Sequence, residues 1–107
     1  MRSLGIYYGD TLLDENESNN KIMLEYYRVE KTATRSINQK TFYGITIVKK
    51  EYKRDGIEFE KNCIERISTN ENKIGNIIET LKKNKVTPIA LNDVLADLLK
   101  QPQFQGN

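Results

Sequence analysis

Two pairs of acidic residues have spacings that could support acid–base chemistry. Glu58 and Glu60 are two apart in a segment with strand-like alternation, so both carboxylates project from one face. Asp93 and Asp97 are four apart in a helical pattern, which also places them on one face. Such a pair works as acid and base only if one member is buried. Solvated charge is the commoner arrangement, and negative charge in the first turns of a helix is favourable. We therefore interpret both pairs as solvated faces.

The other residues that could carry catalysis are few. The chain has no histidine, which removes the usual activating base for a serine or cysteine nucleophile. The single cysteine, Cys63, has Lys61 and Arg66 nearby in sequence, but it also has apolar neighbours typical of packing. No Gly-rich phosphate loop or dinucleotide fingerprint is present. We therefore expect a protein that is not an enzyme.

Metal sites also lack ligands. Zinc is excluded by the absence of histidine and the single cysteine. Oxygen-bearing side chains stand at five positions of an EF-hand-like calcium loop: Asp14, Asn16, Ser18, Asn20 and Glu25. Against calcium, residue 19 is asparagine where that loop needs glycine, and no helix is expected on either side. We expect no metal and no cofactor.

The elements that position these residues follow from hydrophobic periodicity. The 107 residues suit one domain, with 30% charged residues, 37% hydrophobic residues and a net charge of +2. We expect residues 1–20 to be partly flexible, with a loop from residue 10. Residues 21–67 alternate as an antiparallel sheet, and residues 69–101 form two amphipathic helices. The predicted fold is α+β: an antiparallel three- to four-stranded meander packed on one face by a C-terminal helical hairpin.

Local signals mark the boundaries of these elements. Asp55 and Gly56 are typical of a type I′ hairpin turn. Ser68 and Glu71 have the spacing of a capping box at the start of the first helix. Pro88 ends that helix by restricting the residue before it. The lone cysteine and the lack of an apolar run of signal or membrane length lead us to expect a cytoplasmic protein without membrane contact.

Part of the chain, residues 43–99, carries a recognisable pattern. Its residues are Tyr43, Gly44, Ile45 and Ile47, then Ile67, Ser68 and Thr69, then Val86, Thr87, Pro88, Leu91, Asp93, Val94, Asp97 and Leu98. This pattern resembles a family of small uncharacterised proteins from clostridia and related Firmicutes, a domain of unknown function. The resemblance implies a globular cytoplasmic protein and supplies no activity, ligand or catalytic residue.

Aromatic residues are the strongest indication of function. Helices on one face of a sheet leave its other face open, and so small a core cannot hold every strand aromatic. The candidate interface consists of Tyr26, Tyr27, Phe42, Tyr43 and Tyr52. Tyrosine is large, rigid and able to hydrogen-bond, as interfaces require. The sequence therefore predicts a protein-interaction or regulatory module, such as an inhibitor of a host complex or an adaptor to one. The partner could also be a second copy of the chain.

Nucleic-acid binding is the alternative. The stretch 49–54 would place cations and one aromatic ring at a hairpin tip, where they could contact phosphates and stack on a base: Lys49, Lys50, Tyr52, Lys53 and Arg54. Four acidic residues in the same hairpin would cancel much of this field, namely Glu51, Asp55, Glu58 and Glu60. Charge at a hairpin tip also protects a sheet edge from aggregation.

Overall fold

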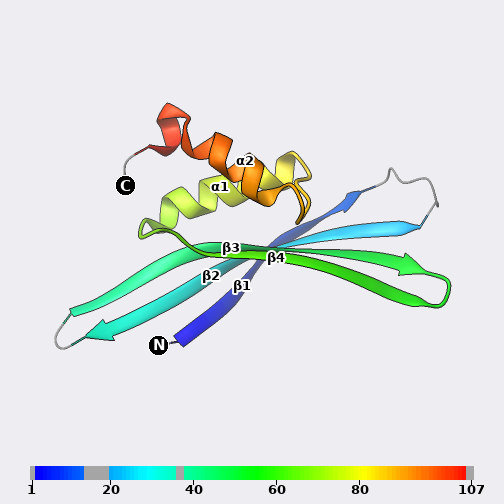
Figure 1. Ribbon diagram of the computed structural model, residues 1–107, viewed down its shortest axis with the longest axis horizontal. Coiled ribbons are helices and arrows are strands. Elements are labelled where there is room, and N and C mark those ends of the chain that lie inside the picture. The colour runs from blue at the N-terminus through cyan, green and yellow to red at the C-terminus, as the bar shows by residue number, and fades with distance from the viewer. Residues whose placement is uncertain (1, 14–19, 36–37, 106–107) are drawn as a thin grey trace.

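A computed structural model describes residues 2–13, 20–35 and 38–105. It contains one antiparallel sheet in the order β1-β2-β3-β4, followed by two helices and a short 3₁₀ turn (Figure 1). The elements are β1 (Arg2–Leu13), β2 (Lys21–Arg35), β3 (Asn38–Lys53), β4 (Gly56–Ser68), α1 (Glu71–Lys83), α2 (Leu91–Leu99) and η1 (Pro102–Phe104). The predicted α+β meander with a C-terminal helical hairpin is confirmed, with four strands.

The strands are longer than their sequence patterns suggest. β1 continues to residue 13, beyond the expected start of a loop at residue 10, because it pairs with β2 from Arg2 opposite Thr32 to Leu13 opposite Ile22. The polar stretch 31–40, which has no clear period, is likewise paired on both sides of the β2–β3 connection. Cross-strand hydrogen bonds order these segments where the hydrophobic pattern is weak.

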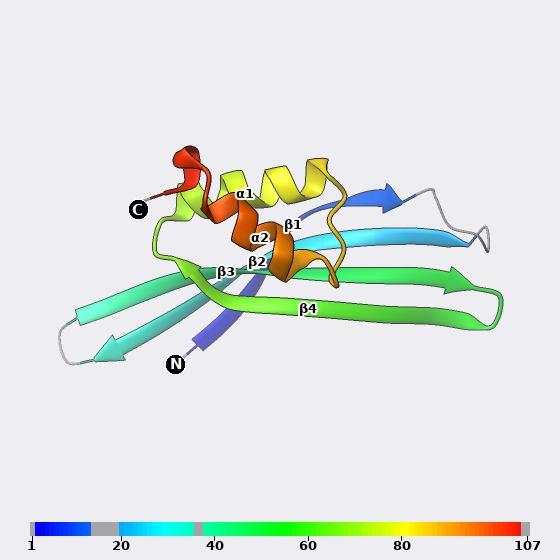
Figure 2. The same cartoon turned by 45° about the horizontal axis from the view of Figure 1, so that its top comes forward.

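The helices bury their apolar stripes against one face of the sheet. The core consists of Leu24, Tyr26, Ile45, Ile47, Ile74, Ile77, Ile78, Leu81, Val86, Leu91, Leu95, Leu98 and Phe104. Both helices cover only the middle of the sheet, and the strand hairpins extend beyond them (Figures 1 and 2). The molecule is therefore long and thin, with principal extents of 53 × 31 × 18 Å.

The ends of α1 differ in detail from the sequence prediction. The capping residue is Asn70, whose side chain accepts a hydrogen bond from the Lys73 amide at 3.1 Å. The Ser68 hydroxyl instead accepts from the Asn70 amide at 3.0 Å. After α1, Lys85 takes a left-handed conformation with φ 52°. The Val86 amide then donates to the Leu81 carbonyl, as in a Schellman cap.

The β3–β4 hairpin also differs by one residue. Arg54 and Asp55 form the turn, and Gly56 is the first residue of β4. Gly56 has φ 151°, whereas neither Arg54 nor Asp55 has a positive φ. The expected type I′ turn at Asp55 and Gly56 needs positive φ at both central residues and is therefore not formed.

Candidate binding surface

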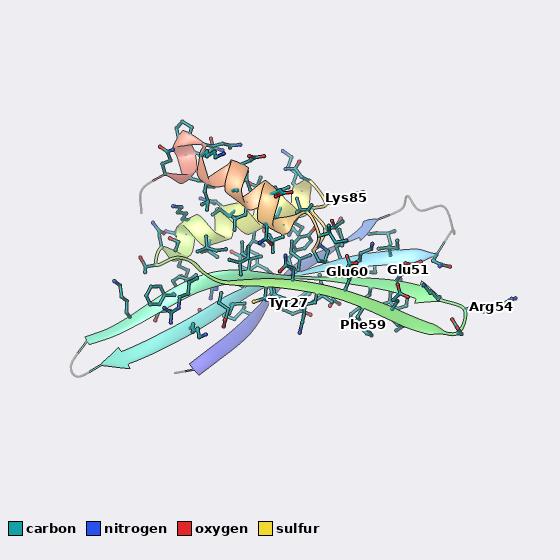
Figure 3. All side chains as sticks on the ribbon, viewed as in Figure 1. Tyr27, Glu51, Arg54, Phe59, Glu60 and Lys85 are labelled. Carbon is teal, nitrogen blue, oxygen red and sulfur yellow. The ribbon has the colours of Figure 1, made fainter. Side chains whose placement is uncertain are left out.

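The face of the sheet that the helices leave uncovered, here called the open face, follows from strand alternation and register. Figure 3 shows Tyr27 and Phe59 on this side and Glu51 and Glu60 on the helix side. The open face includes Tyr7, Asp10, Leu12, Lys21, Met23, Glu25, Tyr27, Val29, Lys31, Lys40, Phe42, Thr46, Val48, Lys50, Tyr52, Ile57, Phe59, Lys61 and Cys63. Glu65 and Arg66 contact its residues from a β4 bulge.

Exposed apolar side chains collect on the open face. Of the six large hydrophobic residues that are exposed in the described part of the chain, five lie here: Tyr7, Leu12, Tyr52, Ile57 and Phe59. Their exposed fractions run from 38% for Tyr52 to 62% for Phe59. The sixth, Ile89, lies in the connection between the helices. Four of the five surround Met23 near the β3–β4 turn. We call this group the apolar end: Leu12, Met23, Tyr52, Ile57 and Phe59.

A hydrogen-bonded network occupies the middle of the open face. The rings of Tyr7 and Tyr27 meet edge to face at 5.6 Å. The Tyr27 hydroxyl and the Lys50 ammonium both donate to Glu25, at 2.9 and 3.0 Å. The Tyr7 hydroxyl donates to Asp10, and this hydrogen bond, with some burial, raises the pKa of Tyr7 to about 12. The network fixes the orientation of the rings, and Lys50 neutralises the Glu25 carboxylate.

The opposite end of the open face is cationic. Phe42 lies beneath two cations, with the Arg66 guanidinium 4.9 Å and the Lys40 ammonium 5.8 Å from its ring centroid. Lys31 donates to Glu65 at 2.8 Å, and this hydrogen bond lowers the pKa of the Glu65 carboxyl. We call Lys31, Lys40 and Arg66 the cationic end.

The structure divides the predicted interface between the two faces. Tyr27, Phe42 and Tyr52 lie on the open face. Tyr26 is instead fully buried beneath the helices, where its hydroxyl donates to the Val86 carbonyl at 3.0 Å. Burial raises the pKa of Tyr26 to about 12. Tyr43 packs on the helix side with the Arg28 guanidinium 5.4 Å from its ring. The placements of Tyr26 and Tyr43 on an open face are therefore corrected, because adjacent strand residues point to opposite faces.

The sequence interpretation missed other residues of this surface. Ile57 and Phe59 show clear alternation but were not included in the predicted interface. They are exposed because they lie on the face of the sheet opposite the helices (Figure 3 shows Phe59 there). Tyr7 and Leu12 belong to β1, whose full length has no clear pattern. The signal that could have found Ile57 and Phe59 was the hairpin pairing, which places them opposite Tyr52 and Lys50 on one face of the sheet.

The basic hairpin does not present one continuous cationic surface. Lys50 and Tyr52 point to the open face, whereas Lys49 and Lys53 point to the other side. Lys50 pairs with Glu25 at 3.0 Å, and Lys53 pairs with Glu58 at 2.7 Å. These hydrogen bonds raise the pKa of both lysines. Arg54 stands at the tip of the turn (Figure 3).

The catalytic candidates do not gather into one site. Glu58 is exposed and bonded to Lys53, while Asp93 and Asp97 are exposed on α2. Cys63 is exposed on β4 opposite Thr46. Of the calcium-loop positions that were considered and rejected, Asp14, Asn16 and Ser18 lie outside the described residues. Within residues 2–13, 20–35 and 38–105, no cluster of three or more His, Cys, Asp or Glu side chains is arranged to hold a metal ion. In the same ranges no helix has the length and apolarity needed to span a bilayer.

Comparison with known proteins places the chain in a family. No curated protein and no solved structure matches it. A family model described as "Family of unknown function (DUF6514)" matches residues 13–101. The match is wider than the resemblance at residues 43–99, since it also includes β2 and thus most of the open face. The chain belongs to the family of unknown function DUF6514.

Proposed function

We propose that this protein is a non-enzymatic protein-interaction module that binds its partner through the open face. The observation that carries the proposal is the placement of Tyr7, Leu12, Tyr52, Ile57 and Phe59 together on the side of the sheet without helices. Exposed aromatic and apolar side chains that form one contiguous group mark interaction sites. Tyrosine, phenylalanine and methionine are enriched in the centres of interfaces.

The dimensions of the sheet support this use. Four strands at a spacing of about 4.8 Å span about 19 Å, and 13 residues at about 3.4 Å each extend about 44 Å. Their product, about 800 Å², equals the area that each partner contributes to a standard stable interface. The hydrogen bonds from Tyr7 to Asp10 and from Tyr27 to Glu25 hold these side chains in place, which lowers the entropy lost on binding.

The biological role that we propose is regulatory. A small domain with a large surface whose side chains are held in place suits an inhibitor of a host protein complex or an adaptor to it. A second copy of the chain is a further candidate partner. The lone cysteine and the absence of histidine support a cytoplasmic, non-enzymatic role.

Nucleic-acid binding remains the second candidate, because cations lie over aromatic rings on the open face. Lys21 lies 5.4 Å from the Tyr52 ring centroid and Lys50 5.9 Å from that of Phe59. Such rings and cations can stack on bases and contact phosphates. The pairing of Lys50 with Glu25 and of Lys53 with Glu58 weakens this candidate, since two of the four cations of the basic hairpin are already neutralised.

Affinity capture with matched variants tests the proposal. Phe59→Glu places a charge in the apolar end, next to Lys50, which can pair with it and keep the sheet folded. Ile89→Glu makes the same change at an exposed apolar residue away from the open face. We expect proteins captured by the wild type to be retained by Ile89→Glu and lost by Phe59→Glu. Sedimentation analysis of the three proteins identifies a second copy as the partner. Equal capture by all three would contradict the proposal, and loss of captured nucleic acid alone would favour the second candidate.

A further inference from the structure

Two cations at the cationic end lack the carboxylate partners that the other cations near them have. On the same face, Lys31 is paired with Glu65 and Lys50 with Glu25. Lys40 and Arg66 form no ion pair within the described residues, and both lie over the ring of Phe42. A ring supports a cation without neutralising it, so these two charges remain available to an external anion.

A notch of about 320 Å³ opens beside these cations. It is lined by Lys40, Phe42, Arg66, Ile67, Ser68 and Thr69. No acidic residue is among these lining residues. The hollow between the sheet and α1 differs, because Arg28 there is already paired with Glu30 and with Glu71. The hollow at the β3–β4 turn likewise contains Asp55 and Glu58 beside Lys53. The notch therefore combines space, an aromatic ring and two cations that form no ion pair within the described residues, although Arg66 also acts on the nearby Glu65 carboxylate.

We propose that the notch receives a carboxylate side chain from an acidic segment of the protein partner. The inference rests on the proposed function and adds the chemistry of the partner. The Arg66 guanidinium offers a planar fork for a carboxylate, and Lys40 adds a second positive charge. The ring of Phe42 packs against the methylene groups of a glutamate side chain. The hydroxyl of Thr69, which is exposed at the rim, is a further donor.

The position of the notch constrains the partner further. Phe42 and Lys50 are eight residues apart on β3, which corresponds to about 27 Å at about 3.4 Å per residue. Lys50 is directly opposite Phe59 of the apolar end. The partner therefore presents an acidic group about 27 Å from an apolar surface.

Titration of the ¹⁵N-labelled protein with acetylated hexaglutamate tests the inference. Hexathymidylate, an oligonucleotide of similar charge, is titrated in parallel. We expect hexaglutamate to shift the amide signals of residues 40–42 and 66–69. Lys40→Ala combined with Arg66→Ala should weaken its binding about five- to thirtyfold, the effect of losing two exposed charge contacts. The control, Lys83→Ala combined with Lys100→Ala, removes the same charge from two exposed helix-side lysines and should leave binding unchanged.

Three results would overturn the inference: no binding of hexaglutamate, equal weakening in the control variant, or tighter binding of hexathymidylate through the same residues. The first two leave the proposed function intact, because it depends on the apolar end, whereas the third would favour nucleic-acid binding. The affinity capture of partner proteins separates the two proposals. If capture is lost in Phe59→Glu but unchanged in the variant with Lys40→Ala and Arg66→Ala, the open face binds a partner without using the notch.

Discussion

Gly44 allows β4 to cross close to β3, and its replacement by alanine gives the sharpest prediction for the fold. A Cβ at residue 44 would lie 2.1 Å from the Ile64 carbonyl oxygen and 2.4 Å from that of Glu65. Ordinary contact begins at 3.4 Å, so the Ile64 carbonyl would have to move by about 1.3 Å, the difference between 3.4 and 2.1. Loss of about two ladder hydrogen bonds at about 1 kcal/mol each, plus overpacking of about 1–3 kcal/mol, gives about 3–5 kcal/mol.

Urea unfolding followed by circular dichroism measures this loss of unfolding free energy, provided that the slope of unfolding free energy against urea concentration is the same in both proteins. Gly75→Ala is the matched control. A Cβ there would lie 2.7 Å from the Tyr8 hydroxyl, the far end of a side chain that can move aside. The gain in helix propensity, about 1 kcal/mol, should offset the rearrangement and leave stability nearly unchanged. A Gly44→Ala variant that loses less than about 1 kcal/mol would refute the close crossing at the bulge.

Three further changes test other parts of the structure. Tyr26→Phe should cost about 1–2 kcal/mol at neutral pH by leaving the Val86 carbonyl without its donor. Because burial raises the pKa of Tyr26 from 10.0 to about 12, its protonated form stabilises the fold fully below pH 10. About 2 kcal/mol of this stability is then lost as the pH rises to 12. Across this pH range, the free energy of unfolding measured with urea should therefore fall less steeply for Tyr26→Phe than for the wild type. Lys85→Gly should raise the free energy of unfolding by about 0.5–1 kcal/mol, because glycine adopts φ 52° without strain. A loss of stability would contradict that cap. Leu95→Ala should cost about 2–5 kcal/mol in the same assay, and a cost below 1 kcal/mol would place Leu95 outside the core.

The fold was predictable where hydrophobic periodicity is strong. Ile45 and Ile47 alternate on β3, and Ile74, Ile77 and Ile78 recur at helical spacing, so the sheet face and the helix stripe could be paired from sequence. The length of β1 could not be predicted, because Arg2–Leu13 is ordered by its neighbour β2 and not by its own pattern. Capping by Asn70 was also missed, since Ser68 and Asn70 are both suitable capping residues and only the path of the chain decides between them.

The candidate surface was predictable only in part for a related reason. Aromatic residues were correctly identified as a surplus, but Tyr26 and Tyr27 are adjacent and necessarily point to opposite faces. The sequence does not say which of the two faces the helices cover. Phe59 was missed for the same reason, because its alternation does not show whether its face lies beneath the helices or opposite them. The pairing of Lys50 with Glu25 depends on strand register, which brings together residues 25 positions apart.

The reactivity of Cys63 tests most directly whether a partner covers the open face. It is the single cysteine of the chain and is exposed on this face, so one maleimide reagent measures its accessibility. A variant with Cys63→Ser and Ile89→Cys reports on the surface away from the open face. Labelling should be fast for both thiols in the dilute purified protein. In extracts of the cells that naturally contain the protein, we predict at least tenfold slower labelling of Cys63, with the cysteine at position 89 unaffected. Equal labelling rates in extract and in buffer for both thiols would contradict the assignment of the open face as the binding surface.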